Sequence, residues 1–162
     1  MKKIFLAIII LFFLTGNLFA APGSCKQFPE TTTDGFVVVK ILCTGDSSNG
    51  SIPNTTIAID TMGKLFLYTV SAYPTAGGTA PDAADVFILD ANGEDLLGSV
   101  DGGTTANKGA NLIHATLKKT TMPYSGYLSQ IYFAPVTGIL TLKVANQATA
   151  SANYTIELVF TR

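Results

Sequence analysis

The side chains that could carry out chemistry in this chain are few. The 162 residues include one histidine and two cysteines. A Gly-Asp-Ser sequence at 45–47 follows an apolar run, an arrangement that can present the nucleophilic serine of an esterase. Such an esterase also needs an aspartate three positions before its histidine, but Asn111 takes that position relative to His114. Because a Ser-His-Asp triad needs all three groups in one geometry, we predict no catalytic residues and rank an esterase-like hydrolase through Ser47 and His114 last.

The candidate metal ligands are oxygen-bearing side chains around one predicted turn. They are Asp90, Asn92, Glu94 and Asp95. This segment lacks the loop length and the terminal glutamate of an EF-hand. One histidine and two cysteines are too few soft ligands for a zinc or copper site. We therefore predict no metal and no cofactor, with calcium at this turn as the alternative.

The two cysteines, Cys25 and Cys43, are predicted to form a disulfide. Their spacing is not the Cys-x-x-Cys of redox-active pairs, and an isolated pair in an oxidising compartment is most simply a bridge. The bridge would close a loop of about 18 residues and contribute about 3 kcal/mol in the chain-entropy model. It would fasten the N-terminal segment, residues 21–35, to the first strand of the domain.

Residues 1–20 have the three parts of a secretory signal peptide. Lys2 and Lys3 precede an apolar run at 4–14, and Ala20 offers a small residue for cleavage. This run is shorter than the about 20 residues that a membrane-spanning helix needs. We predict cleavage after about Ala20 and a secreted or periplasmic product without a membrane span. An uncleaved anchor is the alternative.

The charge of the mature chain argues against one class of partner. Loss of Lys2 and Lys3 with the signal leaves eight basic and eleven acidic side chains, a net charge of −3. Nucleic-acid-binding domains instead carry clustered positive charge that neutralises phosphates. We therefore predict that this protein does not bind nucleic acid.

The elements that position these residues are predicted to be β-strands, because apolar residues alternate with a period of two and long runs of helix formers are missing. In the second predicted strand we expect Phe66, Tyr68 and Val70 to share one face. Asn92-Gly93 predicts a hairpin with a type I′ turn. The predicted strands are 36–44, 64–72, 84–90, 95–100, 139–145 and 153–161, with loops at 45–54, 74–83 and 101–109.

Short strands at this spacing are typical of a β-sandwich. We predict an all-β fold: one antiparallel sandwich, Ig-like or jelly-roll-like, over residues 36–162. The densest aromatic cluster in it is Tyr124, Tyr127, Tyr132 and Phe133. Because tyrosine and phenylalanine are enriched at protein interfaces, these four residues are the candidate contact surface, with core packing as the alternative.

Two segments carry a family resemblance. They are 84–98 (ADVFILDANGEDLLG) and 135–146 (PVTGILTLKVAN), and a β-branched strand follows at 154–160. Over residues 36–160 the chain resembles a loose family of small β-sandwich proteins encoded among the virion structural genes of tailed phages and prophages. The resemblance implies a sandwich without enzymatic activity. Virion proteins of tailed phages assemble in the cytoplasm, whereas this chain has a signal peptide, which suggests a domain reused on the bacterial outside.

These observations lead to one expected function and one alternative. We expect an exported, non-catalytic sandwich that acts by protein–protein contact, as a structural or accessory subunit of an extracellular, periplasmic or phage-derived assembly. The partner would be another protein or a second copy of the chain. The alternative is a monomeric module that binds a glycan or a small ligand.

Overall fold

The computed structural model describes residues 20–59, 64–97, 110–125, 130–131, 133–136 and 138–162, and all regular structure within them is β. Residues 1–19 of the predicted signal peptide and the predicted loop at 101–109 lie outside the described residues. The strands are β1 (Ser24–Gln27), β2 (Thr31–Thr33), β3 (Phe36–Thr44), β4 (Thr55–Ile57), β5 (Leu65–Pro74), β6 (Ala84–Leu89), β7 (Ala110–Ile113), β8 (Lys119–Thr121), β9 (Tyr124–Ser125), β10 (Gln130–Ile131), β11 (Ala134–Val136), β12 (Leu140–Ala145) and β13 (Asn153–Thr161).

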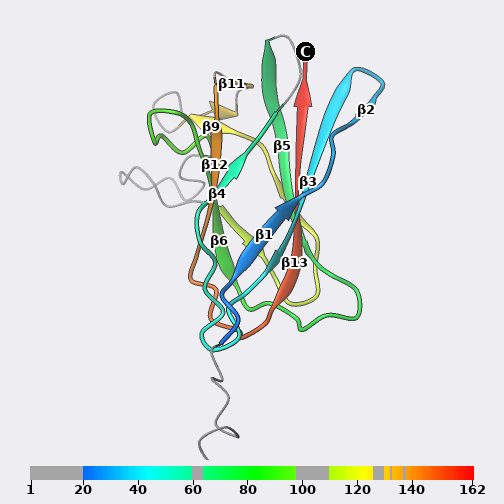
Figure 1. The fold of residues 1–162 in the computed structure, drawn as a ribbon. Helices are drawn as coiled ribbons and strands as arrows, with labels where there is room; N and C mark the ends of the chain where they lie inside the picture. The colour runs from blue at the N-terminus through cyan, green and yellow to red at the C-terminus, as the bar shows by residue number, and fades with distance from the viewer. Residues whose placement is uncertain (1–19, 60–63, 98–109, 126–129, 132, 137) are drawn as a thin grey trace, which may run out of the picture.

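The strands form two packed antiparallel layers (Figure 1). One layer is a seven-stranded sheet with the order β1-β3-β13-β5-β11, in which β2 also pairs with β3 and β8 with β5. The other is a four-stranded sheet with the order β4-β12-β6-β7, and β9 and β10 form a separate pair. The predicted single-domain, all-β sandwich is therefore confirmed. The last two strands, β12 and β13, are consecutive in sequence but lie in different sheets.

Long central strands and short outer strands build the larger sheet. β3, β13 and β5 have 9, 9 and 10 residues. Two short strands share the outer edge of β3, where β2 pairs with residues 36–38 and β1 with 41–44. Two more share the outer edge of β5, where β11 pairs with 65–67 and β8 with 70–72. Short edge strands leave little backbone free for another chain to pair with.

The core lies between the sheets and follows the alternation of the sequence. In β13 the side chains of Tyr154, Ile156, Leu158 and Phe160 are fully buried, whereas the residues between them are partly exposed. The inward residues of β3 behave in the same way. This alternation is the reason that the predicted bounds of both strands, 36–44 and 153–161, match the structure.

The predicted face of β5 is wrong because the strand contains a β-bulge. Phe160 pairs with Leu67 and Val159 with Thr69, so Tyr68 is an extra residue. Because side chains alternate with a period of two, one extra residue reverses the inward and outward faces. Leu67 and Val70 therefore both point into the core, and Tyr68 lies on the outer face instead of sharing a face with Val70.

The type I′ turn predicted at Asn92-Gly93 does not form there. Gly93 has a φ of +83°, but Asn92 is not among the residues with positive φ. Asp34 and Gly35, which join β2 to β3, have φ values of +49° and +83°, as a type I′ turn requires. The strand predicted at 95–100 is reduced to a single bridge between Leu89 and Asp95, and residues 98–100 lie outside the described residues.

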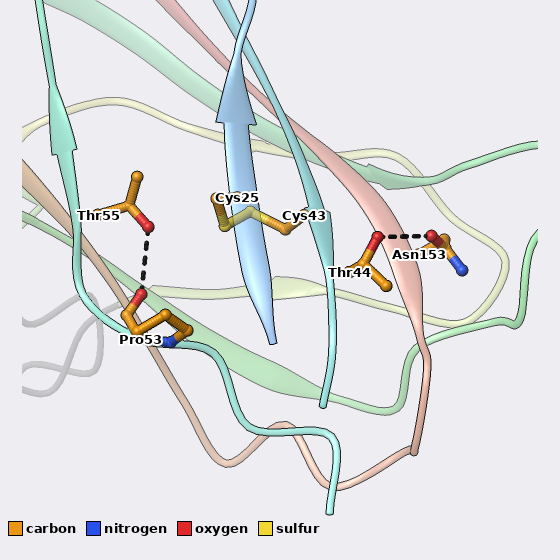
Figure 2. The surroundings of a disulfide bond; sticks show 6 residues. All are labelled: Cys25, Cys43, Thr44, Pro53, Thr55 and Asn153. Atoms are coloured by element: carbon orange, nitrogen blue, oxygen red, sulfur yellow. Dashed lines mark hydrogen bonds between the residues drawn. A yellow bond between two sulfur atoms is a disulfide. The ribbon is translucent and has the colours of Figure 1, made fainter. Parts of the chain in front are cut away.

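The predicted disulfide is confirmed. Cys25 of β1 lies directly opposite Cys43 of β3, and the bridge joins the two strands (Figure 2). The hydrogen bond between Thr44 and Asn153 then ties β3 to β13 beside it, with 2.9 Å between the side-chain oxygens. Because β1 and β2 both pair with β3, residues 24–33 belong to the larger sheet. The disulfide indicates a non-reducing compartment.

A search of the described residues for membrane-spanning helices found none that is long and apolar enough.

Candidate functional site

The residues of the esterase hypothesis are not brought together. Ser47 lies in the loop after β3, where its backbone N–H donates to the carbonyl oxygen of Ala21 at 3.0 Å. His114 follows β7 in the other sheet, and its Nδ1 accepts a hydrogen bond from the N–H of Thr116 at 3.2 Å. No hydrogen bond joins Ser47 to His114. The amide of Asn111, three residues before the histidine, instead donates to Asp85 at 3.3 Å.

Asp46, in the same Gly-Asp-Ser sequence, caps a turn. Its Oδ1 accepts hydrogen bonds from the hydroxyl of Ser48 at 2.5 Å and from the N–H groups of Ser48 and Asn49 at 2.7 and 3.1 Å. These bonds, with the Ser48 hydroxyl foremost, hold the pKa of the Asp46 carboxyl below its usual range. The hydrogen bonds of Asp46 with Ser48 and Asn49 therefore stabilise the conformation of this loop.

The turn after β6, considered for calcium, is likewise organised by its own backbone. Oδ1 of Asp90 accepts from the N–H groups of Asn92 and Glu94 at 2.8 and 2.9 Å. Oδ1 of Asp95 accepts from Ile88 and Leu97 at 3.1 and 3.2 Å. Within the part of the chain that the structure describes, no three His, Cys, Asp or Glu side chains are grouped closely enough to hold a metal ion. The geometry therefore does not support a calcium site there.

Of the four predicted aromatic contact residues, Phe133 is the one whose side chain the structure places. It is 52% exposed and lies next to Ala134, the first residue of β11. Tyr124 begins β9, which pairs with β10. Tyr127 and Tyr132 lie outside the described residues.

Phe133 belongs to a cluster of rings on the outer face of the seven-stranded sheet, the face turned away from the four-stranded sheet. The centroid of Tyr68 lies 5.5 Å from that of Phe133 and 5.6 Å from that of Phe36, with tilted rings. Phe36 is 37% exposed. We call Phe36, Tyr68 and Phe133 the aromatic patch. Ring pairs at such distances contribute about 0.5–1.5 kcal/mol beyond the area they bury.

The patch spans β13, which lies between two of the strands that carry its rings. Phe36 lies on β3 and Tyr68 on β5, with β13 between them. At this level β13 presents the smaller side chains of Val159 and Thr161 to the outer face, and Thr161 pairs with Phe36. Rings from the two flanking strands can therefore meet above β13.

The other half of the same face carries charged side chains. Glu157 of β13 accepts from Lys40 at 3.5 Å and from Lys118 at 3.1 Å. Lys118 also lies over the ring of Tyr73, 5.0 Å from its centroid. Lys26 of β1 pairs with Leu42 on this face. We call Lys26, Lys40 and Lys118 the lysine row.

Side-chain hydrogen bonds join the two sheets on both sides of the sandwich. On one side the amide of Gln27 in β1 donates to the carbonyl of Ala58, just after β4, at 2.5 Å and accepts from its N–H at 3.0 Å. On the other side Nζ of Lys119 in β8 donates to the backbone and side-chain oxygens of Asn111 in β7 at 3.1 and 2.9 Å. Gln27 thus already binds the N–H and C=O groups of Ala58, which a strand of another chain would need in order to pair with this edge. The outer face offers a more accessible contact surface than these edges.

Phe36 and Tyr68 are the members of the patch that the sequence analysis did not identify. Tyr68 was assigned to the face of Val70, and the extra residue of the bulge moves it outward. Phe36 follows the Asp34-Gly35 turn, whose dipeptide is itself a hairpin signal. This signal could have placed Phe36 at a hairpin end, where side chains are often exposed.

Comparison of the chain with models of known protein families, with curated protein sequences and with solved structures found no match.

Proposed function

We propose that this protein is an exported, non-catalytic β-sandwich that acts by protein–protein contact, as a structural or accessory subunit of an extracellular, periplasmic or phage-derived assembly. The observation that carries the proposal is the aromatic patch. Its rings contact one another, and two of its members, Phe36 and Phe133, remain 37% and 52% exposed. A partner that covers them would gain about 25 cal/mol for each Å² of apolar surface removed from water.

The composition and position of the patch support contact with another protein. Single exposed apolar residues are ordinary on soluble proteins, but contiguous apolar surface marks interaction sites. Aromatic residues are also enriched in the buried centres of interfaces. Two members of the patch, Phe36 and Tyr68, lie on the central strands β3 and β5, whose backbone is already paired, so that binding would cost little conformational entropy there.

The disulfide and the predicted signal peptide support the proposed location. A Cys25–Cys43 bridge persists in an oxidising compartment, which an exported chain reaches. The resemblance to virion sandwich proteins favours a role in an assembly. A signal peptide places such an assembly outside the cytoplasm.

Site-specific crosslinking during export tests the proposal. A photoreactive amino acid replaces Phe133 in the full-length chain, and a control carries it at Lys143, which is exposed on β12 in the other sheet. We expect a discrete crosslinked protein species from position 133 and little from position 143. Equal labelling from both positions, or none from position 133, would contradict the proposal.

The glycan-binding alternative uses the same exposed rings in another way. Stacking on sugars favours a flat aromatic platform, whereas Tyr68 is tilted by 40° and 44° to its two neighbours. This geometry favours a protein partner. A strictly monomeric protein that binds a polysaccharide array, and loses that binding when Phe133 is replaced by serine, would support the glycan alternative instead.

A further inference from the structure

The outer face of the larger sheet and the turn after β6 in the smaller sheet differ in charge. On the outer face of the larger sheet, the lysine row provides three ammonium groups, two of which pair with Glu157. The segment 84–97, which holds β6 and its turn in the smaller sheet, has four acidic side chains and no lysine or arginine. The turn itself contributes Asp90 and Glu94, and we call it the acidic turn. Asp95 follows them, but one of its carboxylate oxygens is buried.

We propose that the partner of the outer face is a second copy of this chain, bound head to tail, with the aromatic patch and lysine row of one copy against the acidic turn of the next. This inference rests on the proposed function and specifies its partner. Opposite charges across an interface select partner and register. The aromatic patch supplies the apolar centre of the same contact.

The charges also disfavour a symmetric contact in which the two lysine rows face each other. Two outer faces packed against each other would set one lysine row near another, and like charges across an interface are unfavourable. A head-to-tail contact instead joins two different surfaces. The outer face and the acidic turn belong to different layers, so that one copy can use both at once (Figure 1). Head-to-tail contacts build rings or filaments, depending on whether the rotation closes.

The acidic turn is rigid enough to serve as a contact. The carboxylates of Asp90 and Asp95 accept hydrogen bonds from four backbone N–H groups of the turn and of the strand before it. A further backbone bond joins the N–H of Gly93 to the carbonyl of Asp90 at 3.0 Å. Asn92 and Glu94 are exposed at its tip, where substitution disturbs no core residue.

The test measures self-association of the disulfide-bonded protein comprising residues 21–162, by sedimentation velocity over a wide concentration range. We expect mass to rise with concentration at low salt. We expect association to weaken at about 1 M salt, where the Debye length is about 3 Å. A chain that stays monomeric at every concentration would overturn the inference. If position 133 then still crosslinked to a foreign protein, the proposed function would stand.

Charge-reversal variants identify the two surfaces. The face variant is Lys26→Glu with Lys118→Glu, and the turn variant is Asn92→Lys with Glu94→Lys. We expect each alone to associate about tenfold more weakly or worse, because each sets like charges together. An equal mixture should recover association, since the reversed face meets the reversed turn and the native face meets the native turn.

A matched control and two further outcomes complete the test. Lys143→Glu changes an exposed lysine of β12, outside both surfaces, and should leave association unchanged or strengthen it. Circular dichroism confirms that each variant is folded. If the turn variant associates like the wild type, or the mixture fails to recover association, the head-to-tail contact is wrong.

Discussion

Both halves of the outer face include parts of β3, β13 and β5, but their side chains differ in how they interact and how far they are exposed. In one half Glu157 draws in Lys40 and Lys118, so that the charged groups have partners within the chain. In the other half the rings of the aromatic patch contact one another, and Phe133 remains 52% exposed. A half whose charges pair within the chain can flank an interface, whereas the exposed half is the one that we propose a partner covers.

The bulge at Tyr68 marks the boundary between the halves. Before it Phe66 and Tyr68 point outward, and after it the outward positions are taken by Ser71 and Tyr73. The hydroxyl of Ser71 lies 2.8 Å from that of Thr120 in β8. One extra residue thus gives the same sheet face an apolar region and a polar region.

The largest expected effect on stability comes from removing the disulfide that holds β1, a strand of the charged half, to β3. β1, which carries Lys26, is held to β3 by the Cys25–Cys43 bridge. Replacing both cysteines by alanine should lower the free energy of unfolding by about 3 kcal/mol, because the loop of the unfolded chain is no longer closed. Urea titration with and without a reductant measures it. An unchanged midpoint would show that β1 holds its place without the bridge.

The next effect concerns the loops that close the end of the sandwich beneath the charged half. Gly50 has a φ of +74°, and a Cβ there would lie 2.5 Å from the carbonyl oxygen of Thr149. Gly77 has a φ of +75° with nothing within 4 Å. We expect Gly50→Ala to cost about 2–3 kcal/mol and Gly77→Ala about 1 kcal/mol, because both pay backbone strain but only Gly50 is crowded. Equal losses by thermal unfolding would refute the crowding.

A direct comparison of the two halves comes from one substitution in each. Glu157→Gln should lower stability by about 1 kcal/mol, since two lysines lose their carboxylate, and the loss should shrink at high salt. Phe133→Ser should cost about 0.5 kcal/mol through the lost ring pair with Tyr68, with no such salt dependence. Urea titrations at low and high salt distinguish them. A shared salt response would mean that the halves do not differ as described.

The smallest expected effect is in the core beneath the charged half. The ring of Tyr154 is fully buried, and its hydroxyl has no hydrogen-bond partner in the structure. Burial, with the nearby charge of Asp82, raises the pKa of this hydroxyl. Tyr154→Phe should change the free energy of unfolding by less than about 1 kcal/mol, and in the stabilising direction, because it removes a desolvated polar group. A clear loss of stability would reveal a partner such as a bound water.

The regular alternation of the chain made much of the fold predictable. β3 and β13 were predicted to the residue because every second position, the one that is buried, is apolar throughout both nine-residue strands. The hairpin type at Asn92-Gly93 was not, because the Asp90 carboxylate captures two backbone N–H groups of the turn and only Gly93 takes a positive φ. Whether a carboxylate accepts hydrogen bonds from the backbone of a turn depends on the local conformation, so it leaves no fixed pattern in the sequence.

The candidate site was predictable only in part, for a related reason. Phe133 was identified from local aromatic density, but its contacts with Tyr68 and Phe36 join residues far apart in the chain. They depend on β13 lying between β3 and β5 and on the extra residue of the bulge. Strand order and register arise from long-range pairing, which no local window of sequence contains.

By itself the sequence determined the all-β class, the bounds of β3 and β13 and the pairing of Cys25 with Cys43. Each follows from local periodicity or from the presence of only two candidates. The tertiary structure decided that β12 and β13 lie in different sheets, that Tyr68 points outward and that Lys40 and Lys118 both pair with Glu157. These features require packing between distant segments, where the burial of one strand sets the face that its neighbour presents.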